Sequence, residues 1–101
     1  MLFRSLRVPV QVLDRERGWW TDGELVNLGS GGARLAMPFP LPGERMVRVA
    51  FAMPGDGPLL SLDGRLQWRV PEAQGFAYGM SFVDLRPEAQ LQIDAFVSAS
   101  A

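Results

Sequence analysis

The most constraining feature of the sequence is a two-residue alternation of apolar and polar side chains. It is clearest in residues 59–70, where aspartate, arginine, glutamine and serine separate the apolar positions. The apolar phase contains Leu60, Leu62, Leu66, Trp68 and Val70, together with Gly64. Because strand side chains point alternately to opposite faces, this period predicts a strand with one buried face. We therefore expect Trp68 to lie in the core.

Four further segments show the same period, namely residues 8–12, 33–37, 46–53 and 76–83. Residues 23–28 are the candidate for a sixth strand. Clusters of Gly, Pro, Asp and Asn separate these segments, and such residues favour turns. Short strands at this spacing, each with one apolar face, predict an antiparallel sheet. Six such strands close most economically into a small barrel, which removes exposed edges.

The C-terminal segment changes to a helical period. Its apolar stripe consists of Ala89, Ile93, Phe96 and Val97. Asp84 is placed to cap this helix, and Pro87 suits a first helical turn. Leu91 falls outside the stripe and is a candidate for partner contact. The expected fold is thus mostly β, a six-stranded antiparallel barrel with one C-terminal α-helix, in a single domain of residues 1–101.

Three residue types are missing from the chain: histidine, cysteine and lysine. Their absence removes the usual zinc ligands, the common nucleophile–base pairs, Schiff-base chemistry and the lysine of phosphate-binding loops. Only carboxylate pairs remain, namely Asp14 with Glu16 or Asp22 with Glu24. Both pairs lie in short polar stretches typical of turns or solvated strand faces. We predict a binding protein rather than an enzyme, with no metal and no cofactor.

The charge pattern limits the class of partner. A net charge of −1 lacks the basic surface that binding to a nucleic-acid polymer requires. All ten basic residues are arginine, which suits bidentate recognition of phosphate or guanine at one site. No apolar run approaches the ~18 residues of a membrane span, so we expect no membrane insertion. Arg4 and Arg7 interrupt any secretory pattern, and we expect a cytoplasmic protein.

Three stretches together resemble the PilZ domain family. Residues 7–10, Arg-Val-Pro-Val, resemble the opening of the family's first strand. Residues 27–35 resemble its (Asp/Asn)-x-Ser-x-x-Gly signature at the turn between the second and third strands. Residues 64–68 and 78–82, followed by the final helix, are similar to the family's C-terminal half.

The resemblance implies a bacterial signalling module that receives cyclic di-GMP. In the family, an Arg-x-x-x-Arg segment before the first strand grips guanine and phosphate, and the signature turn contacts a guanine edge. Arginine guanidinium groups offer paired N–H donors, and a glycine-rich turn exposes backbone N–H groups, so both suit these contacts. The resemblance assigns ligand binding to Arg4, Arg7, Asn27, Gly29, Ser30 and Gly32. Arg34, which follows the signature turn, is a further candidate.

The sequence departs from the family pattern at two positions. Phe3 stands where the first arginine is expected, which leaves the shorter segment Arg4-x-x-Arg7. Gly29 occupies the position of the signature serine, with Ser30 beside it. These departures keep open whether the nucleotide still binds.

Two hypotheses follow. In the first, the domain is a cyclic di-GMP receptor, and residues 1–6 become ordered over the ligand. In the second, it is an adaptor that binds only a protein partner, through exposed apolar side chains. The candidate partner residues are Trp19, Trp20, Phe39 and Leu91. Since Trp19 and Trp20 are adjacent and point to opposite faces, we expect one of the two to be in the core.

Overall fold

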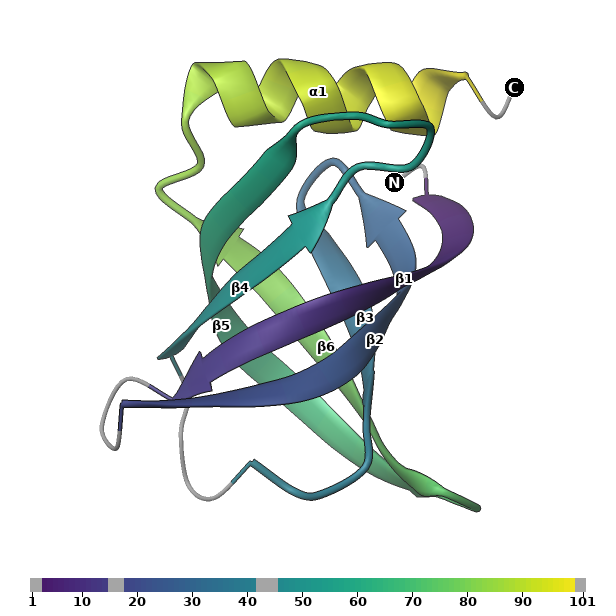
Figure 1. The fold of residues 1–101 in the computed structure, drawn as a ribbon, viewed down its shortest axis with the longest axis vertical. Helices are drawn as coiled ribbons and strands as arrows, with labels where there is room; N and C mark the ends of the chain where they lie inside the picture. The colour runs from purple at the N-terminus through teal and green to yellow at the C-terminus, as the bar shows by residue number, and fades with distance from the viewer. Residues whose placement is uncertain (1–2, 15–17, 42–45, 100–101) are drawn as a thin grey trace.

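The computed structural model describes residues 3–14, 18–41 and 46–99. Its strands are β1 (Phe3–Asp14), β2 (Trp19–Gly29), β3 (Gly32–Met37), β4 (Met46–Ala52), β5 (Leu59–Glu72) and β6 (Gly75–Val83), followed by helix α1 (Pro87–Ser98). All neighbouring strands are antiparallel, and the order β1-β2-β3-β6-β5-β4 forms a closed barrel (Figure 1). The predicted six-stranded barrel with one C-terminal helix is confirmed.

Closure depends on the pairing of the first strand with the fourth. Residues 11–14 of β1 lie opposite residues 47–50 of β4, while β1 also pairs with β2 along most of its length. The N-terminal part of β1 continues past this ladder, so that Phe3 lies opposite Gly29. Both ends of β2 therefore pair with the same strand, β1.

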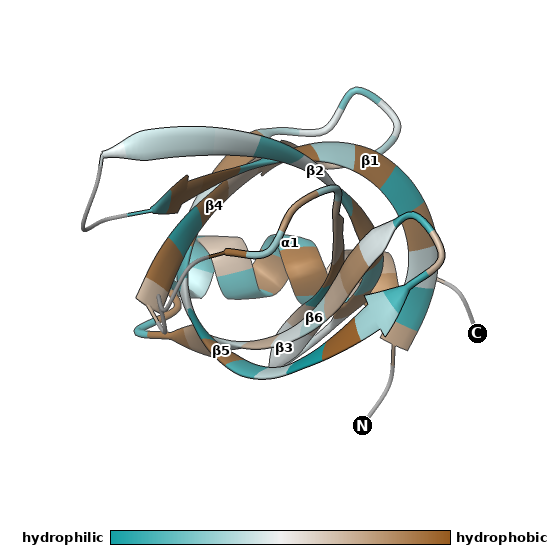
Figure 2. Ribbon diagram, turned by 90° about the horizontal axis from the view of Figure 1, so that it is seen from below, coloured by the Kyte–Doolittle hydropathy of each residue, from teal (hydrophilic) through white to brown (hydrophobic). Residues whose placement is uncertain are grey.

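The core fills the barrel and extends to the helix, which lies across one end (Figure 2). The largest fully buried side chains are Phe51, Leu25, Leu28, Leu35, Ile93, Val10, Val12, Val47 and Val49. Each such side chain contributes about 1.5–3 kcal/mol through removal from water. Ala89, Ile93 and Val97 form the buried side of α1, as the helical stripe predicted. Within the described ranges, no helix combines the length and apolar character needed to cross a membrane.

The start of the helix differs from the prediction that Asp84 caps it. The capping position is Arg86, which makes no side-chain capping bond, and Pro87 begins the helix. Asp84 lies two residues earlier with a φ of 52°. Aspartate tolerates this left-handed conformation. Asp84 therefore lies in the turn that precedes the helix and does not cap the N–H groups of its first turn.

A β-bulge overturns the prediction that Trp68 is a core residue. Leu66 lies opposite Met80, but Trp68 lies opposite Gly79, so Gln67 is an extra residue in β5. An inserted residue exchanges the inward and outward faces of the strand beyond it. Trp68 therefore turns to the outer surface, where it is 45% exposed.

The expectation that one of the paired tryptophans is buried is also wrong. Trp19 is 65% exposed and Trp20 is 50% exposed. Both stand at the hairpin end of β2, where Trp19 lies opposite Asp14 and beyond the buried leucines of that strand. Phe39 and Leu91 are exposed as well, and their contact with a partner stays a prediction.

We predict that Tyr78→Phe destabilises the fold. The Leu41 backbone N–H donates a buried hydrogen bond of 2.7 Å to the Tyr78 hydroxyl, and phenylalanine keeps the ring but removes the acceptor. A buried donor left without a partner costs about 1–3 kcal/mol, which urea unfolding measures. Ser81→Ala, which removes an exposed hydroxyl bonded to Gln67, is the control and should cost less. Equal stability of Tyr78→Phe and the unmodified chain would contradict the prediction.

Candidate functional site

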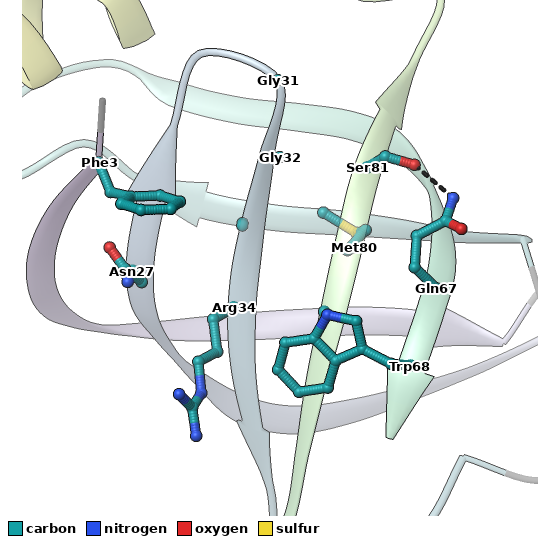
Figure 3. Close-up of a pocket in the computed structure, with 11 residues that line it drawn as sticks. Phe3, Asn27, Gly31, Gly32, Arg34, Gln67, Trp68, Met80 and Ser81 are labelled. Carbon is teal, nitrogen blue, oxygen red and sulfur yellow. Dashed lines mark hydrogen bonds between the residues drawn. The ribbon is translucent and has the colours of Figure 1, made fainter. Parts of the chain in front are cut away.

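A pocket of about 370 Å³ opens on the outer face of the barrel, across β2, β3, β6 and β5. It is lined by Phe3, Asn27, Gly31, Gly32, Ala33, Arg34, Gln67, Trp68, Gly79, Met80 and Ser81. In Figure 3, Phe3 and Asn27 lie on one side, Trp68 and Gln67 lie on the other, and Arg34 lies between them. Its volume falls in the lower part of the ~300–1,000 Å³ typical of small-molecule sites.

Strand register builds the centre of this pocket. Asn27 pairs with Arg34, Arg34 pairs with Gly79, and Gly79 pairs with Trp68. Paired residues project from the same face of a sheet, so four strands place these positions in one row. Gly79 has no side chain, and the Trp68 indole packs onto its backbone where a Cβ atom would stand. A polar amide, a cation and an aromatic ring thus share one surface.

The amide of Asn27 has an unusual environment. Its Oδ1 is buried, and no group in the described part of the chain donates a hydrogen bond to it. A buried acceptor without a partner costs about 1–3 kcal/mol. Asn27 lines the pocket, and a rotation of its amide would bring this oxygen to a ligand with N–H donors.

Arg34 supplies positive charge at the edge of the pocket. Its guanidinium carbon lies 5.7 Å from the centre of the Trp68 ring, within cation–π range. Its Nη2 atom also donates to Oε2 of Glu72 at 3.3 Å. The sequence placed Arg34 on the polar side of its strand, and in the structure this side chain is 45% exposed.

The structure brings together some of the residues assigned by resemblance and separates others. Asn27, Gly32 and Arg34 line the pocket, and Phe3 joins them from β1. The assigned residues that do not line it are Arg4, Arg7, Gly29 and Ser30.

Arg4 is directed to the helix. Its Nη1 atom donates to the carbonyl oxygen of Phe96 at 3.0 Å, and its guanidinium lies 4.2 Å from the centre of that ring. Residues 3–6 already belong to β1, and residues 3–5 pair with β2, so the expected ordering of residues 1–6 on ligand binding does not apply to residues 3–6. Met1 and Leu2 lie outside the described residues.

Arg7 faces outward and pairs with Glu24 of β2. Both line a second pocket, of about 610 Å³, which meets the first at Arg34. Ser30 is exposed, and its carbonyl oxygen accepts a hydrogen bond of 3.2 Å from Nε2 of Gln90 in α1. Gly29 is buried at the end of β2.

Gly32 has a structural requirement of its own. A Cβ atom at this position would overlap the carbonyl oxygen of Met80 in the neighbouring strand. Since that obstacle is backbone, it cannot rotate away. This glycine therefore permits the close approach of β3 to β6 whether or not a ligand is bound.

Phe3, Trp68 and Gly79 were not identified as site residues from the sequence. Trp68 was assigned to the core because its strand appeared regular. A signal did exist at Gly79, because a glycine within a strand often marks a close approach of another group. Here that group is the Trp68 indole.

Of the carboxylates considered for hydrolysis, Asp22 and Glu24 line the second pocket together. Glu16 lies outside the described residues, and Glu24 is engaged by Arg7. In the described ranges no three His, Cys, Asp or Glu side chains gather as a metal site.

Elsewhere on the barrel, the hydrogen bond and the negative charge of Asp63 raise the pKa of the Arg48 guanidinium.

Comparison with known families and structures gives a consistent result. The PilZ domain model matches residues 3–99. Similar solved structures include the inhibitor of motility MotI/DgrA from Bacillus subtilis (TM-score 0.83, 8% identity). They also include YcgR from Escherichia coli in complex with c-di-GMP (TM-score 0.78, 15% identity) and the PilZ domain of CeSA from a cellulose-synthesizing bacterium (TM-score 0.69, 17% identity). No protein of curated function matches the chain.

The coverage of these matches differs. This chain aligns over 98% of its length with MotI/DgrA and 97% with YcgR, but spans only 48% and 43% of those two chains. For the CeSA domain, the alignment covers 99% of this chain and 98% of that one. At these identities the likeness establishes the fold.

We predict that Gly79→Ala displaces the Trp68 indole. The added methyl group would occupy the place of the ring, and such overpacking typically costs about 1–3 kcal/mol. The Trp68 indole N–H resonance should shift in a ¹⁵N-correlated NMR spectrum. Trp20 provides an internal control, since it stands about 20 Å along β2 from the row of paired residues. An unmoved Trp68 resonance would rule out this packing.

Proposed function

This chain belongs to the PilZ domain family, and we propose that it binds cyclic di-GMP in the pocket beside Asn27 and Trp68. The single observation that carries the proposal is the unpartnered, buried Oδ1 of Asn27 in a pocket walled by aromatic rings. Guanine offers N–H donors for that oxygen and a flat face for the rings. The solved complex of the similar YcgR with c-di-GMP supports this choice of ligand.

Each pocket residue has a distinct role in the proposal. Trp68 and Phe3 stand on opposite sides of the pocket (Figure 3), and a guanine base stacks on the Trp68 ring. Base–aromatic stacking contributes about 1–3 kcal/mol per base. Asn27 accepts from the guanine edge, and Arg34 donates to a phosphate. Gly31 and Gly32 complete the lining of the pocket at the turn between β2 and β3.

A second candidate function is that of an adaptor that binds a protein and no nucleotide. The observation that favours it is the exposure of Trp19 and Trp20 at one end of the barrel. Exposed tryptophans are frequent anchors of protein interfaces. In this case the partner would bind equally well with and without cyclic di-GMP.

We predict that the domain binds cyclic di-GMP and that Asn27→Ala weakens this binding about tenfold, because a hydrogen bond to guanine is lost. Trp68→Ala should weaken it by a similar or larger factor through loss of stacking. Isothermal titration calorimetry measures both. Trp20→Ala removes an exposed tryptophan outside the pocket and is the matched control. Absence of binding by the unmodified domain at saturating ligand would refute the receptor function and favour the adaptor.

We predict that Phe3→Arg tightens cyclic di-GMP binding. Phe3 is 59% exposed and lines the pocket, so an arginine there can reach a phosphate without burying its charge. The resemblance to the family places an arginine at this same position. An added charge-assisted hydrogen bond should lower Kd about tenfold in the same titration. Gln11→Arg, also exposed on β1 but eight residues further along the strand and outside the pocket lining, tests whether any added charge suffices.

A further inference from the structure

Two outward-facing arginines beside the pocket each contact a carboxylate from another strand. Arg34 of β3 donates to Glu72 of β5, and Arg7 of β1 pairs with Glu24 of β2. Arg34 matters more for the proposed ligand, because it lines the pocket that contains Asn27. Its ion pair is solvent-accessible, with 45% of the Arg34 side chain and 43% of the Glu72 side chain exposed.

The Glu72 carboxylate and a ligand phosphate require the same donors. Both anions bind guanidinium N–H groups, often in a bidentate manner. The Nη2 atom of Arg34 is already engaged by Glu72 at 3.3 Å. A phosphate that binds Arg34 must therefore displace the carboxylate or share the guanidinium with it.

The surrounding charge strengthens this competition. Besides Arg34 and Arg7, the second pocket is lined by three acidic residues, Asp22, Glu24 and Glu72. Carboxylates outnumber arginines there, so an incoming dianionic ligand meets local repulsion as well as an occupied guanidinium. The contact between Glu72 and Arg34 combines both effects at the edge of the proposed ligand pocket.

We propose that Glu72 is an internal competitor that sets the affinity of the site for its phosphate-containing ligand, an inference that rests on the proposed binding of cyclic di-GMP. Glu72 holds Arg34 in the ligand-free domain and is released when a phosphate replaces it. The apparent affinity is lowered by the fraction of molecules in which the ion pair is formed. An exposed ion pair of ordinary strength corresponds to about a two- to fivefold change in Kd.

The test is a calorimetric titration of cyclic di-GMP into the unmodified domain, Glu72→Gln and Asp22→Asn. Glu72→Gln preserves the shape of the side chain but removes its charge. Asp22→Asn removes a charge from the same second pocket without touching the partner of Arg34. We expect Glu72→Gln to lower Kd about two- to fivefold and Asp22→Asn to change it less than about twofold.

The possible outcomes separate this inference from the proposed function. Tightening by Glu72→Gln alone supports it, as does binding that appears only in that variant. If the unmodified domain binds and Glu72→Gln binds equally, the competitor role is overturned while the receptor function stands. Equal tightening by Asp22→Asn would also overturn it, because general repulsion would then suffice. If no variant binds, the receptor function fails and the competitor role fails with it.

Discussion

The ladder between β1 and β4 is the constraint on which the rest of the structure depends. In the described part of the chain, residues 11–14 pair with residues 47–50, which closes the six strands into a barrel, and the N-terminal part of β1 extends beyond this ladder along β2. That extension brings Phe3 to the far end of β2, beside the signature turn. The register between β1 and β2 then sets which side chains meet there, and a shift in it would move the Phe3 ring away from Asn27.

Most of the fold was predictable because the same burial of alternate apolar side chains recurs along the chain. Alternation marked five of the six strands, and the stripe through Ile93 marked the helix face that closes the core. In β2 the buried Leu25 and Leu28 are three residues apart, because the register shifts between Leu25 and Asn27. The errors arise where one local event changes the pattern. The extra residue at Gln67 reverses the faces of the strand beyond it, so Trp68 lies on the surface and not in the core. In β5, neither residue type nor spacing distinguishes this bulge from a regular strand.

The site was only partly predictable, because it is assembled by register. The signature turn drew attention to Asn27 and Gly32, and proximity in sequence added Arg34. Trp68 and Gly79 meet these residues only through the pairing of four strands, which a single sequence does not specify. Arg4 illustrates the opposite error, since its position in the strand directs it to Phe96 instead of the pocket.

The packing of Gly32 bears on how such domains diverge over evolution. Because the Met80 carbonyl leaves no room for a side chain, selection for folding alone retains this glycine in a lineage that has abandoned its ligand. Its presence in a sequence is thus a marker of barrel ancestry. The buried amide oxygen of Asn27 bonds to no group in the described chain, so folding gives little reason to keep it. Among descendants of this domain, substitution of Asn27 beside a retained Gly32 would record the loss of the proposed nucleotide binding.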